Sequence, residues 1–338
     1  MKTKSITAPI IILTVLIIIS VWACIHIGPE KLGFSEVNSL LMAGLKHEPM
    51  METPIQTIVF ELRLPRILLA ALVGAALALS GTAFQGILRN PLADPYIVGT
   101  SAGAAVGGVI AIVFKLKSSF YGISGVAILA FVCALLAMFL IHKISSKGGK
   151  VPVETFLLAG VIVGSFLWAL VSFLLTVATK EGLQEVIFWL MGSTREAGWS
   201  NVLMLLIYFS ISFAGLMFVS YPLNLLTLGD ESAQHLGVNV EKVKNTVIVF
   251  ASLVTAASVA ACGLIGFVGL MIPHVIRMIA GADHRKLIPL SALAGAVFMM
   301  WVDTAARTII SPQEIPVGIL TAIMGAPFFL YLLRKRNS

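Results

Sequence analysis

The stretch Asp230–Val243, DESAQHLGVNVEKV, lies between two apolar runs of membrane length, at about 201–221 and 245–262. Its two leading acids carry the negative charge that the first turn of a helix favours, and Gly237 is a typical helix stop. A polar helix between two such runs predicts a chain that crosses a membrane and leaves a water-soluble element at its surface.

The same stretch predicts a docking surface. Beyond Gly237, Val238 and Asn239 open a second short segment, which carries Glu241 and Lys242. Two short polar helices on one face of a membrane domain offer a soluble partner protein something to bind. A solvated loop with helical turns and no partner is the alternative, and the pattern alone leaves both open.

The composition sets the fold class. The chain has 338 residues, of which 58% are hydrophobic and 12% charged, and its mean hydropathy is +0.99. Soluble domains carry about a quarter charged residues. The apolar runs reach the roughly 20 residues that a helix needs to cross a bilayer, and they lack the alternation of barrel strands. We therefore expect an all-α, polytopic membrane protein that forms a single domain over residues 1–338.

We expect about ten spans, with both termini in the cytoplasm. Pro273 interrupts the eighth span and should end or kink it. The amphipathic stretch 181–191 is too short to span and should lie at the surface. Gly99, Gly103 and Gly107 recur every four residues, which predicts close helix packing. The spans are placed at about 6–27, 65–88, 96–114, 120–142, 154–178, 200–221, 245–262, 264–280, 287–308 and 316–333.

Lysine and arginine in the predicted loops set the orientation. With both ends inside, fourteen of the 23 fall on the cytoplasmic side and nine on the outer side. The inner set includes Lys2 and Lys4, and the outer set includes Lys117. This bias follows the positive-inside rule, so the Asp230–Val243 stretch is expected to face the cytoplasm.

Motifs that would carry chemistry are scarce. The chain has no H-E-x-x-H, no G-x-S-x-G and no Cys/His cluster, so we expect neither catalytic residues nor a metal site. Cys24, Cys133 and Cys262 lie in or beside apolar runs and are interpreted as packing residues. A phosphate-binding G-x-x-x-x-G-K-[ST] loop is also missing. This chain should bind no cofactor, and any ATP and Mg²⁺ would belong to a partner subunit.

The distribution of ionisable groups bears on the energy source. Asp303 lies near the outer end of its span, and His142 and His274 lie near inner ends. Proton-driven carriers need titratable groups near the middle of the membrane, so this pattern disfavours them. Sodium coupling through backbone carbonyls stays open, which keeps an ion-coupled carrier of a small solute as the alternative function.

Arg63 and Arg66 bracket Pro65 at the predicted outer start of a span. Positive charge there opposes both the helix dipole and the positive-inside bias, which favours a functional role. Neutralisation by Glu61 is the local alternative.

Arg307 is a third arginine at the predicted outer face. Asp303 precedes it by four positions, the favourable order for an ion pair within a helix. An internal pair and an outward role are both open.

The segment 89–95, RNPLADP, is a turn at the predicted inner face. Its two prolines prevent a continuous helix, and Asn-Pro commonly starts a turn. It is either a simple connection or a neutral constriction at the inner mouth of a path.

Several long motifs together resemble one known family, the FecCD-type permeases of iron-siderophore, haem and cobalamin ABC importers, which have ten helices per subunit. The similarity covers nearly all of the chain beyond about residue 60. The motifs are Leu62–Arg66 (LRLPR), Leu88–Pro95 (LRNPLADP), Gly269–His274 (GLMIPH), Gly281–Gly295 (GADHRKLIPLSALAG) and Pro312–Phe328.

The resemblance implies a homodimer with the substrate path on its two-fold axis. It also implies two cytoplasmic ATPase subunits and an extracytoplasmic substrate-binding protein, all at the cytoplasmic membrane of a bacterium or archaeon. The coupling helices would span about 230–243, with ATPase contacts at Asp230, Glu231, Ala233, Gln234, His235, Leu236 and Gly237. Binding-protein salt bridges would come from Arg63, Arg66 and Arg307, and the inner gate from Leu88, Asn90, Pro91, Ser145 and Ser146.

Two positions depart from the family pattern. Many members have a basic residue where Gln234 stands, which puts one ATPase contact in doubt, and Ala282 replaces a common proline. The implied cargo is a metal chelate, with ferric siderophore first and haem or cobalamin close behind. ATP-driven alternating access is therefore the expected mechanism.

Overall fold

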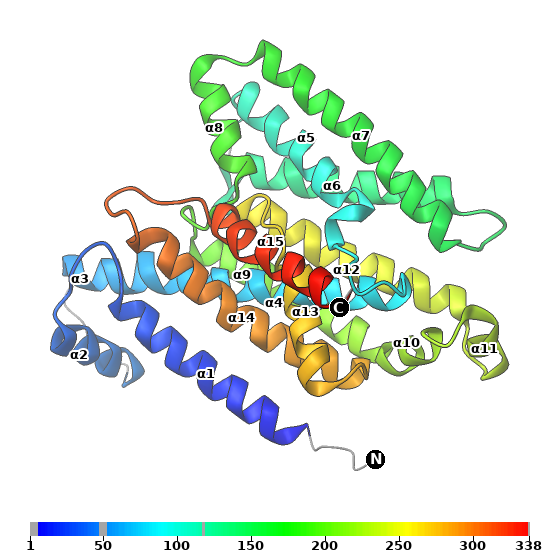
Figure 1. Cartoon of the computed structure of the whole chain (residues 1–338). Helices are drawn as coiled ribbons and strands as arrows, with labels where there is room; N and C mark the ends of the chain where they lie inside the picture. The colour runs from blue at the N-terminus through cyan, green and yellow to red at the C-terminus, as the bar shows by residue number, and fades with distance from the viewer. Residues whose placement is uncertain (1–5, 47–52, 117–118, 337–338) are drawn as a thin grey trace.

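The computed structural model describes residues 6–46, 53–116 and 119–336, so Lys2, Lys4 and Lys117 lie outside the described residues. Almost all regular structure is helical (Figure 1). The helices are α1 (Thr7–His26), α2 (Phe34–Leu45), α3 (Pro54–Thr57), α4 (Leu64–Ile87), α5 (Thr100–Val113), α6 (Gly125–Ser145), α7 (Val153–Val177), α8 (Lys180–Leu190), α9 (Trp199–Phe218), α10 (Ser220–Leu226), α11 (Asp230–His235), α12 (Val240–Cys262), α13 (Val268–Ala280), α14 (His284–Thr308) and α15 (Val317–Arg336). A π-helical turn (Ile58–Arg63), a 3-10 turn (Pro95–Val98) and a small hairpin of β1 (Ser119–Phe120) and β2 (Ile123–Ser124) complete the described elements.

The all-α membrane fold is confirmed. Within the described residues, seven helical segments are long and apolar enough to cross a membrane. The shorter apolar helices α5, α13 and α15 occupy the places of three further predicted spans. The count of ten crossings and the cytoplasmic termini stay predictions. Helix α8 covers nearly all of the stretch 181–191, where a short surface helix was expected.

Helix α4 is the centre of the fold. Most of its side chains are buried, and it packs along α14 so closely that a Cβ on Gly74 would overlap the carbonyl oxygen of Gly295. Figure 1 shows α10 and α11 at one end of the molecule and α3 at the other. These are called the α11 end and the α3 end.

The glycine face of α5 packs as predicted. A Cβ on Gly103 would lie 2.6 Å from the Cβ of Ala137, and one on Gly107 would overlap the carbonyl oxygen of Leu129. Both neighbours belong to α6, so the small residues bring two backbones into contact. In Figure 1 these helices, with α7 and α8, form a group beside α12.

Two boundaries differ from the prediction. The helical run through Pro65 begins at Pro54 and not at the proline, because the π-helical turn Ile58–Arg63 leads into α4 without a break. Pro273 does not end its helix. The chain is non-helical ahead of it instead, where Phe267 adopts a left-handed conformation (φ 68°) at the start of α13.

Candidate functional site

The predicted docking stretch forms a short helix with one exposed face. Helix α11 runs from Asp230 to His235, and Gly237 (φ 83°) turns the chain in a conformation that glycine adopts readily. Ala233 is fully buried and anchors the helix. Glu231, Gln234, His235, Leu236 and Gly237 are exposed, with Leu236 at 59%. The helix therefore exposes a polar face and one large apolar side chain.

The second short helix is not where the sequence predicted it. The segment from Val238 is not separate, because Asn239 accepts a hydrogen bond from the Lys242 N–H (3.0 Å) and caps α12, which runs unbroken to Cys262. The second short helix is α10, Ser220–Leu226, which precedes α11. The apolar run at 201–221 ends earlier than expected, at Phe218.

Asp230 links the exposed helix to two membrane helices. Its carboxylate accepts a hydrogen bond from the Arg89 guanidinium, at the end of α4, and another from the Lys244 amine on α12 (2.6 Å). Arg89 also donates to the Leu226 carbonyl at the end of α10 (2.9 Å). One carboxylate thus ties α11 to α4 and α12.

Lys244 is buried because it lies on the apolar stripe of α12. Val240, Val243, Val247 and Ile248 share that face, and the Lys244 side chain is only 5% exposed. A buried cation is tolerated when it is paired. Its partners are Asp230 and Glu241, the latter at 3.7 Å. The other carboxylate oxygen of Glu241 accepts a hydrogen bond from the Val151 N–H (2.8 Å), which extends the network to the loop after α6.

The predicted gate residues divide by burial. Leu88 caps α4 and is buried, whereas Asn90 and Pro91 are exposed in the turn that follows. The Asn90 side chain accepts the Leu92 N–H (2.9 Å) and so closes the turn upon itself.

The second predicted gate segment lies at the end of α6. Ser145 is buried and donates to the His142 carbonyl (3.1 Å), and Ser146 ends the helix. The two gate segments both connect to α12, one through Arg89 and Asp230 and the other through Val151 and Glu241.

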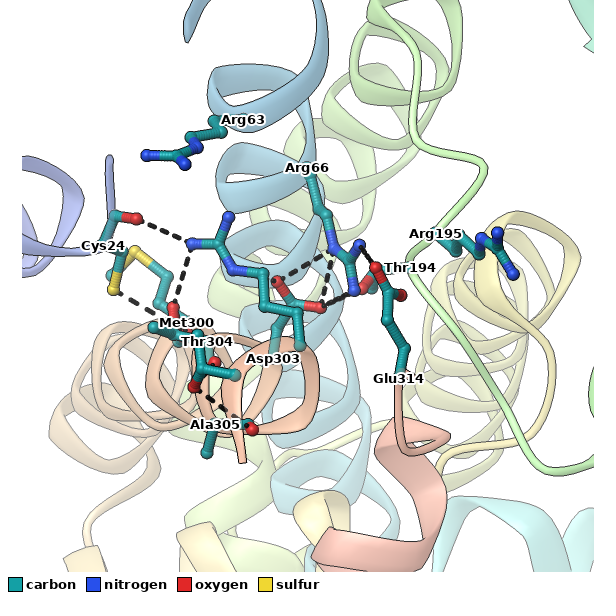
Figure 2. Close-up of polar contacts among 12 residues, drawn as sticks. Cys24, Arg63, Arg66, Thr194, Arg195, Met300, Asp303, Thr304, Ala305 and Glu314 are labelled. Atoms are coloured by element: carbon teal, nitrogen blue, oxygen red, sulfur yellow. Dashed lines mark hydrogen bonds and ion pairs between the residues drawn. The ribbon is translucent and has the colours of Figure 1, made fainter. Parts of the chain in front are cut away.

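The α3 end holds a compact ion cluster. Arg66, on α4, binds Asp303 on α14 through its Nε (3.1 Å) and Nη2 (3.0 Å), and binds Glu314 through its Nη1 (3.0 Å). Thr194 donates its hydroxyl to the same aspartate. Figure 2 shows these four side chains turned toward one another. Asp303 is fully buried, and a buried carboxylate is tolerated where it is paired and hydrogen-bonded in this way.

The other two arginines hold the end of α1. Arg63 donates to the carbonyls of Ile25 (2.7 Å) and Glu30. Arg307 donates to the Cys24 carbonyl (2.7 Å). The last carbonyls of a helix lack intrahelical donors and carry its negative dipole end, so guanidinium groups suit them.

The burial of the three arginines bears on their expected role as docking residues. Arg63 is 4% and Arg307 2% exposed, and the Arg66 side chain is 11% exposed. Their guanidinium groups bind carbonyls and carboxylates of the same chain. The acids that neutralise Arg66 are Asp303 and Glu314 and not Glu61. The expected pair of Asp303 with Arg307 is present at 3.9 Å. Contact of these arginines with a docked protein stays a prediction that this geometry does not support.

An open cavity adjoins the cluster. It has a volume of about 820 Å³, and its lining includes Glu185, Arg195, Glu196, Asn201 and Glu314. Arg195 is exposed, and Figure 2 shows it pointing away from the ion cluster. The exposed charge at the α3 end is therefore of mixed sign and surrounds a hollow surface.

Sequence reasoning missed the network around Lys244, although a signal was present. Lys244 falls at helical spacing among buried valines, which marks a cation that must find an internal partner. The pair of Arg66 with Glu314 spans 248 positions in the sequence, and local pattern contains no information about such a pair.

Comparison with known proteins shows which family this chain resembles. The FecCD transport family model matches residues 13–335. The cobalamin import system permease protein BtuC of Halobacterium salinarum is 47% identical over 282 residues, which cover 83% of this chain and 74% of that protein. The hemin transport system permease protein HmuU of Yersinia pestis is 41% identical over 279 residues, covering 82% and 83%.

One further relative and one solved structure cover nearly the whole chain. The molybdate import system permease protein MolB of Haemophilus influenzae is 39% identical over 327 residues, covering 96% of this chain and 94% of that protein. A solved metal-chelate type ABC transporter in an inward-facing conformation is 37% identical and superposes with a TM-score of 0.84, covering 96% and 98%.

Proposed function

The chain belongs to the FecCD transport family, and from that membership we propose that it imports a metal chelate as a homodimer coupled to two cytoplasmic ATPase subunits. Its place in the family makes it a multi-pass permease subunit of an ABC importer in the cytoplasmic membrane. The chain itself performs no hydrolysis and binds no nucleotide in this proposal. ATP and Mg²⁺ act in the partner subunits.

The exposed face of α11 carries the proposal. Glu231, Gln234, His235, Leu236 and Gly237 would contact the ATPase, while Ala233 anchors the helix. Asp230 would pass its displacement to α4 and α12 through Arg89 and Lys244. Mechanical coupling requires such a rigid link. A partner shifts the equilibrium between two membrane conformations only if its contacts differ between them, and the link carries that difference into the membrane helices.

The gate would be moved by the same links. Leu88, Asn90 and Pro91 follow the α4 end that Arg89 ties to Asp230. Ser145 and Ser146 precede the loop that Glu241 holds through Val151. Displacement of α11 would therefore reach both predicted gate segments.

Docking of a substrate-binding protein is proposed at the α3 end. The exposed charges beside the cavity there, among them Arg195 and Glu196, are available to a partner. Arg63, Arg66 and Arg307 would support that surface from within, as their internal bonds indicate.

The relatives' names support a metal compound as the cargo. A cobalamin, a hemin and a molybdate permease all share more than a third of their aligned residues with this chain. Cobalamin is the first compound to test, because the relative with 47% identity is named for it. Haemin, ferric siderophores, ferric citrate and molybdate complete the panel.

Leu236→Asp tests the dock. A charge at this exposed apolar side chain should weaken its contact with the ATPase. Co-purification of the ATPase subunits and ATP-dependent uptake should both fall, while the membrane domain stays folded. Leu116→Asp, at a leucine that is 43% exposed in the loop after α5, is the matched control. Full uptake by Leu236→Asp would remove α11 from the role of dock.

The energy source separates the proposal from an ion-coupled carrier. Proteoliposomes should hold this chain with its ATPase and binding protein, and a protonophore should leave initial uptake nearly unchanged because the spans lack mid-membrane acids. Removing ATP should abolish uptake. If this chain alone accumulates solute and collapse of an ion gradient stops it, the importer proposal is wrong.

A further inference from the structure

A second polar junction at the α11 end is not used by the dock described above. Asn224, on α10, donates from its Nδ2 to the Asp283 carboxylate (2.7 Å). Its Oδ1 accepts from the His284 backbone N–H (2.8 Å) and lies 2.7 Å from the His284 Nδ1. Asp283 and His284 form the start of α14, so one amide fastens α10 to that helix.

The chemistry of the junction fixes its orientation. A backbone N–H can only donate, so the atom of Asn224 that receives it must be the carbonyl oxygen. His284 must then carry a proton on Nδ1 in order to share that oxygen. The amide nitrogen is left to face Asp283, which needs a donor. Each partner is thus matched to one atom of Asn224, and an aspartate or a leucine there would break the match.

The junction also touches α4. A Cβ on Gly86 would lie 2.8 Å from the His284 Nε2 and 3.0 Å from the Leu223 side chain of α10. His284 is 3% exposed, and its Nε2 has no hydrogen-bond partner among the residues that the structure describes. The last turn of α4, α10 and the first turn of α14 therefore meet without space for a side chain at Gly86.

Helices α4 and α14 continue from this junction to the α3 end. They are held close at Gly74 and Gly295, where their backbones touch. At the far end they are joined again by Arg66 and Asp303. A displacement of α10 at the Asn224 junction would therefore move a pair of helices fastened at both ends.

We propose that Asn224 is a positioning residue that transmits movement of α10 to the start of α14 through Asp283 and His284. Residues Gly281–Arg285 would then receive the movement of α10, in the same way that α4 and α12 receive the movement of α11 through Asp230. The inference rests on the proposed function, since it presumes ATP-driven movement of α10 and α11.

The test measures coupling separately from docking. Asn224→Asp replaces the donor with a charge that repels Asp283. Losing a hydrogen bond to a charged group shifts an equilibrium by roughly tenfold, so transport per ATP hydrolysed should fall by about that factor. Copies of the ATPase bound per permease, and basal ATP hydrolysis, should stay as in the unchanged protein because α11 is intact. Radiolabelled cobalamin and ferric citrate serve as probes in proteoliposomes of the full complex.

Two further variants make the result specific. Exchanging the pair, Asn224→Asp together with Asp283→Asn, restores one donor facing one acceptor and should recover part of the coupling. Recovery is partial because the same Asp283 oxygen that accepts from Asn224 also accepts the Arg285 N–H (3.1 Å), and that cap of α14 is lost when the amide nitrogen takes its place. Thr227→Ala is the matched control, since the hydroxyl of this residue at the end of α10 donates to the Asn224 backbone carbonyl (2.7 Å) and not to its side chain. It should leave the coupling unchanged.

The outcomes separate the two proposals. If Asn224→Asp loses bound ATPase in proportion to uptake, the residue acts in docking and the inference is wrong. If the exchanged pair recovers the melting temperature but not the coupling, the junction is only structural and the inference is again wrong. If the unchanged complex shows no ATP-dependent uptake of any compound in the panel, the proposed function fails first.

Discussion

Asp230→Asn should destabilise the protein mainly by stranding Lys244. The amine of Lys244 lies on a side chain that is 5% exposed, and Asp230 is its nearest acid at 2.6 Å. Removing one partner of a buried ion pair costs about 3–5 kcal/mol, because the other charge stays buried. Glu241 remains at 3.7 Å and offsets part of this, so about 2 kcal/mol is expected from Lys244.

Arg89 adds less to the effect. Its side chain and that of Asp230 are each 38% exposed, and exposed pairs contribute about 0–1 kcal/mol. The loss for Asp230→Asn should therefore total about 2–3 kcal/mol. With the unfolding entropy per residue of globular proteins, this corresponds to a melting temperature lower by about 3–4 °C.

The assay is thermal unfolding of the purified permease in detergent at low salt, followed by intrinsic fluorescence. Lys244→Met in the Asp230→Asn background removes the stranded cation and should recover about 2 kcal/mol, as replacing buried charges by apolar groups often does. Glu231→Gln, the adjacent exposed acid, is the control and should change stability by less than about 0.5 kcal/mol.

Two results would refute the reasoning. Unchanged stability of Asp230→Asn would show that Lys244 does not depend on this carboxylate. A double variant with Lys244→Met that is no more stable than Asp230→Asn alone would show that the cost does not come from a stranded cation. A double-mutant cycle that includes the single variant Lys244→Met measures the coupling of the pair, because the separate contacts of Asp230 with Arg89 and of Lys244 with Glu241 are then lost in the single variants too.

Three further predictions follow from the geometry. Arg66→Ala leaves the buried Asp303 without its main partner, so it should lower the free energy of unfolding by about 3 kcal/mol, measured by chemical unfolding; a loss below about 1 kcal/mol would contradict the burial. The Arg285 guanidinium holds the pKa of Asp283 well below its usual range, so this carboxylate stabilises the fold above about pH 4 and loses that effect as pH falls through its folded pKa. Below about pH 5, the melting temperature of Asp283→Asn should therefore depend less on pH than that of the unchanged protein. Gly74→Val should overpack the α4–α14 contact and lower the free energy of unfolding by about 1–3 kcal/mol, measured as a lower melting temperature. An unchanged melting temperature would disprove the close approach of the two helices.

The sequence predicted the elements well, because their signals are local. Membrane-length apolar runs, the Gly237 stop and the four-residue glycine spacing on α5 each depend on neighbours a few residues away. All of these correspond to helices or helix contacts in the structure. The continuation of the helix through Pro65 was missed, since a π-helical turn has no clear sequence signature.

The site was predicted only in part, because polar pairing is a tertiary property. The exposure of Leu236 and the burial of Ala233 fit a docking helix; charge and spacing singled out that segment, and the family resemblance implied its role as a coupling helix. Arg63 and Arg66 were expected to contact a docked protein from the outer start of a span, whereas Arg63 is buried and the Arg66 side chain is 11% exposed. The acid or carbonyl that an arginine binds depends on contacts between helices far apart in the sequence, so local sequence patterns could not predict it.

The arginines at the end of α1 have a consequence for biogenesis. Helix α1 is the first described span to leave the ribosome, and chains mature from their N-terminus during synthesis. The Ile25 carbonyl can be capped once Arg63 is made, but the Cys24 carbonyl needs Arg307, which is synthesised more than 280 residues later. The last of these caps on α1 therefore forms only when α14 has been made. A permease truncated before residue 307 would leave the Cys24 carbonyl at the end of α1 without this donor.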